Sequence, residues 1–141
     1  MDALDVIGRL PLEFICPSEV KDELDEGAAH GYQLIAPPWL TVVPLTGHLS
    51  PVSVAALDRG EAAVIQLAVE HGWLRVSIDE LQGRRIAVGL GLNIVGSLGL
   101  IGRAKTLGII SAVRPLIEKA TQEGVHYHPD LVNEVLEAMG E

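Results

Sequence analysis

Residues 60–108, which read GEAAVIQLAVEHGWLRVSIDELQGRRIAVGLGLNIVGSLGLIGRAKTLG, decide the fold of this chain. Short apolar runs suited to strands alternate there with longer runs whose apolar residues recur at helical spacing. Glu61, Asp79 and Ser97 stand where one kind of run passes into the other. Open α/β sheets keep their chemistry at such strand ends, so the same stretch predicts both the fold and the position of a site.

The segments on either side continue this alternation. The patterns predict strands at residues 12–16, 40–45, 74–78 and 92–95. They predict helices at residues 2–10, 18–26, 51–57, 61–71, 80–90, 98–107 and 111–123, and from residue 129 onward. Strands alternating with helices favour an α/β fold, in which a mainly parallel four-stranded sheet is flanked by helices. We expect one domain over residues 1–141.

Composition narrows the class of protein. The chain has 141 residues, and its 48% apolar content is enough for a packed core. The net charge of −9 disfavours a broad basic surface for nucleic acid but leaves room for a local basic cleft. A lone cysteine, Cys16, allows no internal disulfide. No apolar run reaches the roughly 18 residues of a membrane helix, and the first residues lack the basic head of a signal peptide. We therefore expect a cytoplasmic protein that does not enter the membrane.

Two carboxylates are candidates for metal binding. Glu61 falls in the first turn of a predicted helix, and Asp79 follows a predicted strand. A structural interpretation explains each of them, because an acidic residue at a helix start interacts favourably with the helix dipole or caps the helix. From spacing alone, that interpretation is favoured. The functional interpretation requires the fold to bring the two together, since Mg²⁺ needs oxygen ligands that converge from different elements.

Basic residues cluster in the same stretch of an otherwise acidic chain. Arg84, Arg85 and Lys105 are candidates for neutralising RNA phosphates. The alternative is that they pair with nearby acids on solvated helix faces. Ser97, in a Gly-Ser-Leu-Gly sequence, is placed either to contact a phosphate at a helix N-terminus or simply to cap that helix.

The order of these motifs resembles a family of PIN-like proteins related to the VapC toxin ribonucleases. The resemblance rests on Gly-Glu-Ala at 60–62, Ile-Asp-Glu at 78–80, Gly-Arg-Arg at 83–85, Gly-Ser-Leu-Gly at 96–99, Ala-Lys at 104–105 and the closing helices from residue 114 onward. Each motif is weak alone, whereas their order and spacing are specific. The resemblance covers almost the whole chain and is strongest over residues 58–108.

The resemblance implies a PIN-like three-layer fold and a ribonuclease that uses Mg²⁺ or Mn²⁺. Glu61 matches the acid of the family's Gly-Glu motif, and Asp79 matches the acid after the later strand. These two are the implied metal ligands, and Glu80 joins them as a third implied catalytic residue. Arg84, Arg85, Ser97 and Lys105 are then the expected contacts to RNA. A toxin of this family also implies a small antitoxin protein as partner.

The chain departs from the family pattern at its start. PIN proteins open with a strand that ends in Asp or Asn, whereas residues 3–10 resemble the helix that follows that strand. We therefore expect a metal site short of one ligand, weakened or absent catalysis, direct pairing of residues 12–16 with 74–78, and a homodimer.

Two alternatives to the ribonuclease stay open. The first is a non-catalytic interaction protein that uses the same fold to bind an antitoxin-like partner or itself. The second, a nucleotide-binding α/β protein, ranks last because the chain has no phosphate-binding loop.

Overall fold

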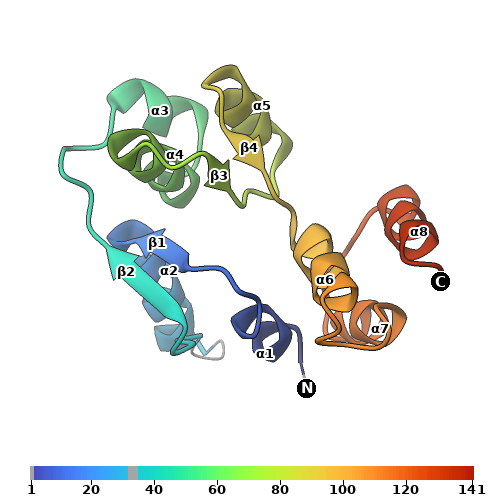
Figure 1. The fold of residues 1–141 in the computed structure, drawn as a ribbon. Helices are drawn as coiled ribbons and strands as arrows, with labels where there is room; N and C mark the ends of the chain where they lie inside the picture. The colour runs from blue at the N-terminus through green and yellow to red at the C-terminus, as the bar shows by residue number, and fades with distance from the viewer. Residues whose placement is uncertain (1, 32–34) are drawn as a thin grey trace. The chain divides into compact units, whose positions relative to one another are not determined.

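The computed structural model describes residues 2–31 and 35–141, which fall into two compact units (Figure 1). The middle unit is Glu13–Val95, and the terminal unit joins Met1–Leu12 to Gly96–Glu141. The expectation of one domain over the whole chain stays a prediction. Among the helices of the described residues, none combines the length and the apolar character needed to cross a membrane.

The strands of the middle unit pair in parallel, as predicted. Strand β1 (Phe14–Pro17) pairs with β2 (Leu40–Val43), and Phe14 lies opposite Leu40. Strand β3 (Arg75–Val76) pairs with β4 (Asn93–Ile94). The α/β class is thereby confirmed, although β3 and β4 are much shorter than the apolar runs that predicted them.

The expected four-stranded sheet does not form. The described strands make two separate two-stranded sheets, so the predicted pairing of residues 12–16 with residues 74–78 is wrong. Both β1 and β3 instead pack against helix α4 (Arg59–His71). A two-residue strand such as β3 offers few backbone groups to a second neighbour, and Pro17 at the end of β1 has no N–H to donate.

Helix α4 is the centre of the middle unit. It packs against α2 (Ser18–Ala29), α3 (Pro51–Ala56) and α5 (Leu81–Gly89). Its buried residues include Ala62, Ile65 and Ala68 at helical spacing, and they join a core completed by Leu57, Val76, Ile78, Ala87 and Leu92. The helix stops at Gly72, whose φ of 68° is the left-handed conformation that glycine adopts without strain.

Several helix boundaries differ from the sequence patterns, and three of them have a clear physical reason. Helix α2 continues through Gly27 to Ala29, since an isolated glycine weakens a helix without ending it. Helix α4 begins at Arg59 instead of at Glu61, because the Asp58 side chain caps it by accepting the Glu61 N–H. Helix α6 (Ser97–Thr106) has Gly96 as its cap residue, so Ser97 is already inside the helix and makes no capping hydrogen bond.

The terminal unit is entirely helical in its described residues. Besides α6 it contains α1 (Ala3–Gly8), α7 (Arg114–Gln122) and α8 (Pro129–Ala138). Its most deeply buried side chains include Val6, Ile101 and Val113. Pro129 begins α8 as predicted, with His128 as the cap residue.

Glu141 fastens three helices of this unit together. Its carboxylate accepts the backbone N–H groups of Val113 at 2.8 Å and Arg114 at 3.0 Å, and Lys105 Nζ donates to it at 2.9 Å. These two N–H groups, and then the Lys105 ammonium, lower the pKa of Glu141 to about 2. The carboxylate is therefore charged, and binds the start of α7, at neutral and mildly acidic pH.

Candidate active site

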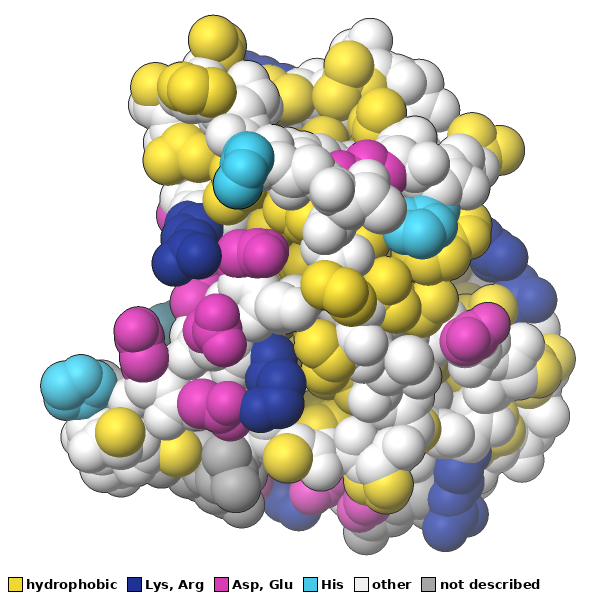
Figure 2. Space-filling view, turned by 90° about the vertical axis from the view of Figure 1, so that its left-hand side faces the viewer, with side chains coloured by type: hydrophobic (Ala, Val, Ile, Leu, Met, Phe, Trp, Pro, Cys, Tyr) yellow, Lys and Arg dark blue, Asp and Glu magenta, His cyan; other side chains and the backbone are white. Residues whose placement is uncertain are grey.

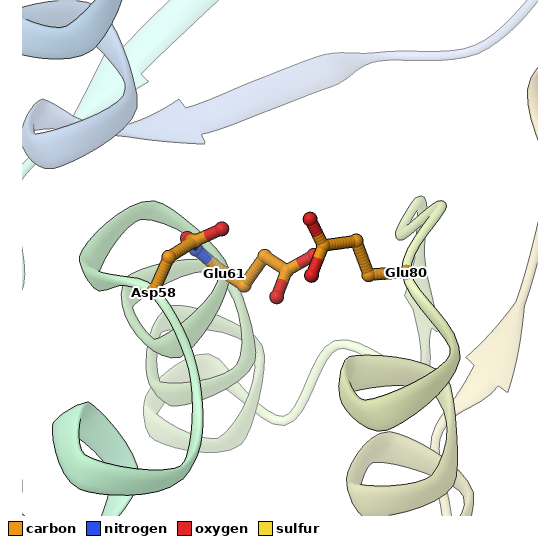
Figure 3. Close-up of side chains that lie close together, drawn as sticks. All are labelled: Asp58, Glu61 and Glu80. Atoms are coloured by element: carbon orange, nitrogen blue, oxygen red, sulfur yellow. Dashed lines mark hydrogen bonds between the residues drawn. The ribbon is translucent and has the colours of Figure 1, made fainter.

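Three carboxylates meet beside the N-termini of two helices in the middle unit. Asp58 is the cap residue of α4, Glu61 lies in the first turn of that helix, and Glu80 is the cap residue of α5. One oxygen from each of these side chains lies within 4.8 Å of the other two. The Glu61 and Glu80 carboxylates face each other, and the Asp58 carboxylate lies beside the start of the Glu61 side chain (Figure 3). The two chain segments that carry them converge because α4 and α5 pack together.

Local structure fixes Asp58 and Glu61. Asp58 Oδ1 accepts the Glu61 N–H at 2.8 Å, which satisfies one of the free donors at the start of α4. The Glu61 carboxylate lies against α5 at Gly83, where the helix has no side chain. A Cβ at position 83 would lie 3.3 Å from Glu61 Oε2 and 2.8 Å from Ile78 Cγ2. Close packing of α5 therefore requires glycine at this position.

The electrostatics of the group are unfavourable without a counter-ion. Glu61 Oε2 is buried and has no hydrogen-bond partner among residues 2–31 and 35–141. Burial raises the pKa of Glu61, and the negative charges of Asp58, Glu80, Asp79 and Glu23 raise it further. A buried carboxylate oxygen without a partner costs free energy, so the group is poised to accept a cation or a proton.

The sequence patterns missed two of these acids. Asp58 falls between the helices predicted at residues 51–57 and 61–71 and is not among the predicted ligands. Glu23 lies on α2, where its Oε1 accepts the Gly60 N–H at 3.1 Å and its charge acts on Glu61. The sequence does contain a signal for each. Asp58 stands three residues before Glu61, which is the spacing of a capping box. Glu23 lies on the helix that directly follows strand β1.

The predicted acidic residues are placed as follows. Glu61 and Glu80 are together in the group. Asp79 is exposed in the loop between β3 and α5, outside the group of three, and close enough for its charge to raise the pKa of Glu61. The structure thus groups Asp58 with Glu61 and Glu80, whereas the sequence analysis had paired Asp79 with Glu61.

The four residues expected to contact RNA differ in how they are engaged. Arg84 Nε donates to the carbonyl of Ile78 at 2.7 Å, and Arg85 is exposed. Lys105 Nζ is occupied by the Met139 carbonyl at 2.7 Å and by Glu141, as the alternative of pairing with an acid predicted. Ser97 Oγ lies 3.4 Å from the Tyr127 hydroxyl. The last two belong to the terminal unit.

The residues of the group fit a hard divalent cation. All the side-chain donors are carboxylate oxygens, which Mg²⁺ and Mn²⁺ prefer. The acids could simply cap their helices, but Glu61 Oε2 is buried without a hydrogen-bond partner in the described residues. This observation favours a cation at the group. No sulfur or imidazole ligand belongs to the group, so a zinc site of the usual composition does not fit it.

The raised pKa of Glu61 predicts how pH acts on stability. A carboxyl group whose pKa is higher in the folded state contributes stability below its unfolded value of 4.5, and this contribution is lost as pH rises through the folded value. We expect Glu61→Gln to raise the melting temperature of the metal-free protein at neutral pH and to change it little in acid. Melting in chelator from about pH 4 to about pH 8 measures this.

Two comparisons sharpen that measurement. Excess Mg²⁺ should stabilise the unsubstituted protein, by about 2.7 kcal/mol at a hundred times the dissociation constant, and should have little effect on the variant. Glu13→Gln removes an exposed carboxylate ahead of β1 and is the control. A Glu61→Gln protein that is no more stable at pH 8 than the control would contradict an uncompensated charge at this position.

Comparison with known protein families now identifies the fold. A family model described as a PIN domain matches residues 1–141. No curated protein and no solved structure matched the sequence. The match spans the whole sequence, and parallel strands and helices surround an acidic group of the expected composition. The chain therefore belongs to the PIN-domain family.

Proposed function

We propose that this PIN-domain protein is an endoribonuclease that depends on Mg²⁺ or Mn²⁺. Glu61, Glu80 and Asp58 bind the ion, and Asp79 and Glu23 contribute charge beside it. The observation that carries this proposal is the buried Glu61 Oε2, which has no hydrogen-bond partner in the part of the chain that the structure describes and lies in a group of three carboxylates from two helix N-termini.

A divalent ion bound here would lower the pKa of a water molecule and neutralise charge on a phosphodiester. The residues of the chain have the complementary tasks. The Asp58 capping bond and the Glu23 bond to Gly60 fix the start of α4, and with it the direction of the Glu61 side chain. Asp79 is exposed beside the group, and we assign to it the role of accepting a proton from the attacking water.

The direct test is cleavage of single-stranded RNA by the purified protein. We expect cleavage with Mg²⁺ or Mn²⁺ and none with chelator. Residual activity in chelator would point to a contaminating nuclease or to a reaction that needs no metal. If neither ion supports cleavage over long incubation, the catalytic proposal fails and the non-catalytic alternative takes its place.

We further propose that the protein is the toxin of a toxin–antitoxin pair, with a small antitoxin protein as partner, and that it forms a homodimer. Several large apolar side chains of the middle unit are exposed, and apolar side chains are visible on the face shown in Figure 2. The most exposed are Val52, Leu74, Leu81 and Val88, and Val52 is 78% exposed. Surfaces rich in such side chains mark protein interfaces.

Self-association is the part of this proposal that the purified protein can test alone. We expect multi-angle light scattering to give the mass of a dimer, since two-fold pairing is the simplest closed way to cover an apolar surface. Val52→Lys together with Leu81→Lys should shift the mass toward the monomer without unfolding the protein. If the unsubstituted protein stays monomeric at high concentration, the proposed homodimer is wrong.

A further inference from the structure

Arg84 is the basic side chain fixed most directly to the acidic group. Its Nε donates to the carbonyl of Ile78 at 2.7 Å, and Ile78 is the residue before Asp79 and Glu80. Its backbone N–H also donates to the Glu80 carbonyl at 3.0 Å. One side of the guanidinium is thereby fixed to the loop that carries Asp79 and Glu80. The preceding residue, Gly83, packs against Glu61, because a Cβ there would lie 3.3 Å from Glu61 Oε2.

The rest of the guanidinium is available. Within residues 2–31 and 35–141, Arg84 forms no ion pair, although acids surround the start of its helix. Its terminal Nη nitrogens donate to no described acceptor, and neither is among the buried atoms that lack a partner, so they reach solvent. The described residues therefore do not support the alternative that Arg84 pairs with a nearby carboxylate.

A guanidinium with this arrangement suits a phosphate. Arginine presents several N–H donors in a rigid fork that matches phosphate oxygens, and fixing Nε lowers the entropy lost when the remaining donors bind. In a chain with a net charge of −9, a nucleic acid strand meets repulsion unless a fixed cation receives it near the acids. Lys105 is already occupied by Glu141 and Met139, and exposed Arg85 makes no hydrogen bond through its side chain in the described residues.

We infer that Arg84 is the phosphate anchor of this site: its Nη groups bind one backbone phosphate of an RNA strand beside the carboxylate group while its Nε stays bound to Ile78. The inference rests on the proposed function, since it takes an RNA strand as the substrate. It differs from a general basic surface because it assigns the binding to one arginine that the fold orients.

The test measures binding apart from cleavage. A fluorescein-labelled single-stranded RNA is titrated with Glu61→Gln protein, in which cleavage should be slowed roughly 10²- to 10³-fold, and with the Glu61→Gln, Arg84→Ala double variant, both in Mg²⁺. We expect at least a tenfold loss of affinity, as for loss of a charged hydrogen bond. The plot of log affinity against log salt should become shallower by roughly 0.7, the contribution of one phosphate contact to a single strand.

Matched variants separate the anchor from other roles. Arg85→Ala removes the same charge one residue away and should change affinity less than threefold or so, while Arg84→Lys should recover the salt dependence but only part of the affinity. Calorimetry with Mn²⁺ on the Arg84→Ala protein should give an unchanged metal affinity. A lowered metal affinity would show that Arg84 acts by holding the Asp79–Glu80 loop, and would overturn the inference.

The remaining outcomes are equally decisive. Equal losses from Arg84→Ala and Arg85→Ala would overturn the anchor and leave the proposed nuclease intact. If inorganic phosphate, but not RNA, binds in an Arg84-dependent way, the ligand is free phosphate and the inference is wrong. If the unsubstituted protein cleaves no RNA and neither protein binds any, the proposed function fails and the anchor fails with it.

Discussion

Replacing Glu61 by glutamine should lower metal-dependent RNA cleavage by roughly 10²- to 10³-fold, the loss seen when one electrostatic group is taken from a catalytic centre. The substitution keeps the shape of the side chain and its contact with Gly83, while it removes the charge from the buried Oε2 that has no partner. Initial cleavage rates over a range of Mg²⁺ concentrations measure the effect, and Glu13→Gln is the control with an exposed carboxylate.

Substitutions of the neighbouring acids test whether the structure or the sequence motif identifies the metal ligands correctly. Glu80→Gln removes a member of the group, and Asp58→Asn removes another while asparagine still caps α4. We expect each to weaken cleavage at least tenfold. Asp79→Asn should lower the rate at saturating Mg²⁺ and leave the metal affinity unchanged, because Asp79 lies outside the group and its proposed role is to accept a proton from water. If Asp79→Asn abolishes cleavage and Glu80→Gln is neutral, the motif identifies the ligands better than the structure does. Wild-type rates from Glu61→Gln would refute the site altogether.

The residues of the candidate site that local sequence predicts are those at the start of a helix. Glu61 and Glu80 stand at the starts of α4 and α5, and local sequence shows both helices. Asp58 and Glu23 were not found, because their membership depends on distance in space: Glu23 reaches Gly60, 37 residues away, through the packing of α2 on α4. An acid that caps a helix and an acid that binds a metal have the same local pattern, and only convergence separates them.

The fold was predictable to a similar depth. Apolar periodicity located every described helix and strand to within a few residues. It did not show that β1 and β3 remain apart, because apolar runs such as residues 74–78 predict strand conformation and carry no information about the neighbouring strand. Pairing of Lys105 with an acid was predicted as an alternative, but its partner Glu141 was not identified, because the two are separated by 36 residues.

Replacing Gly83 by alanine should destabilise the protein and weaken metal binding, although alanine is the better helix former. Alanine in the helix contributes up to about 1 kcal/mol in favour of folding. Against this, its Cβ would lie 2.8 Å from Ile78 Cγ2, and Ile78 is only 4% exposed in the core, so it has little room to move. Overpacking of this kind costs about 1–3 kcal/mol. We expect a net loss of about 1–2 kcal/mol in the free energy of unfolding, measured in urea.

The site should report the same collision. The new Cβ would also stand 3.3 Å from Glu61 Oε2, so relief of the contact with Ile78 pushes α5 and its Glu80 away from Glu61, or turns the Glu61 carboxylate out of the group. The increase in melting temperature on adding Mg²⁺ should therefore shrink. Gly89→Ala is the matched control in the same helix, because no atom lies within 4 Å of its Cβ position and only the gain in helix propensity remains. If Gly83→Ala were stabilised as much as Gly89→Ala, α5 would have room beside Glu61, and the close packing that brings Glu61 and Glu80 together would not be what determines the site.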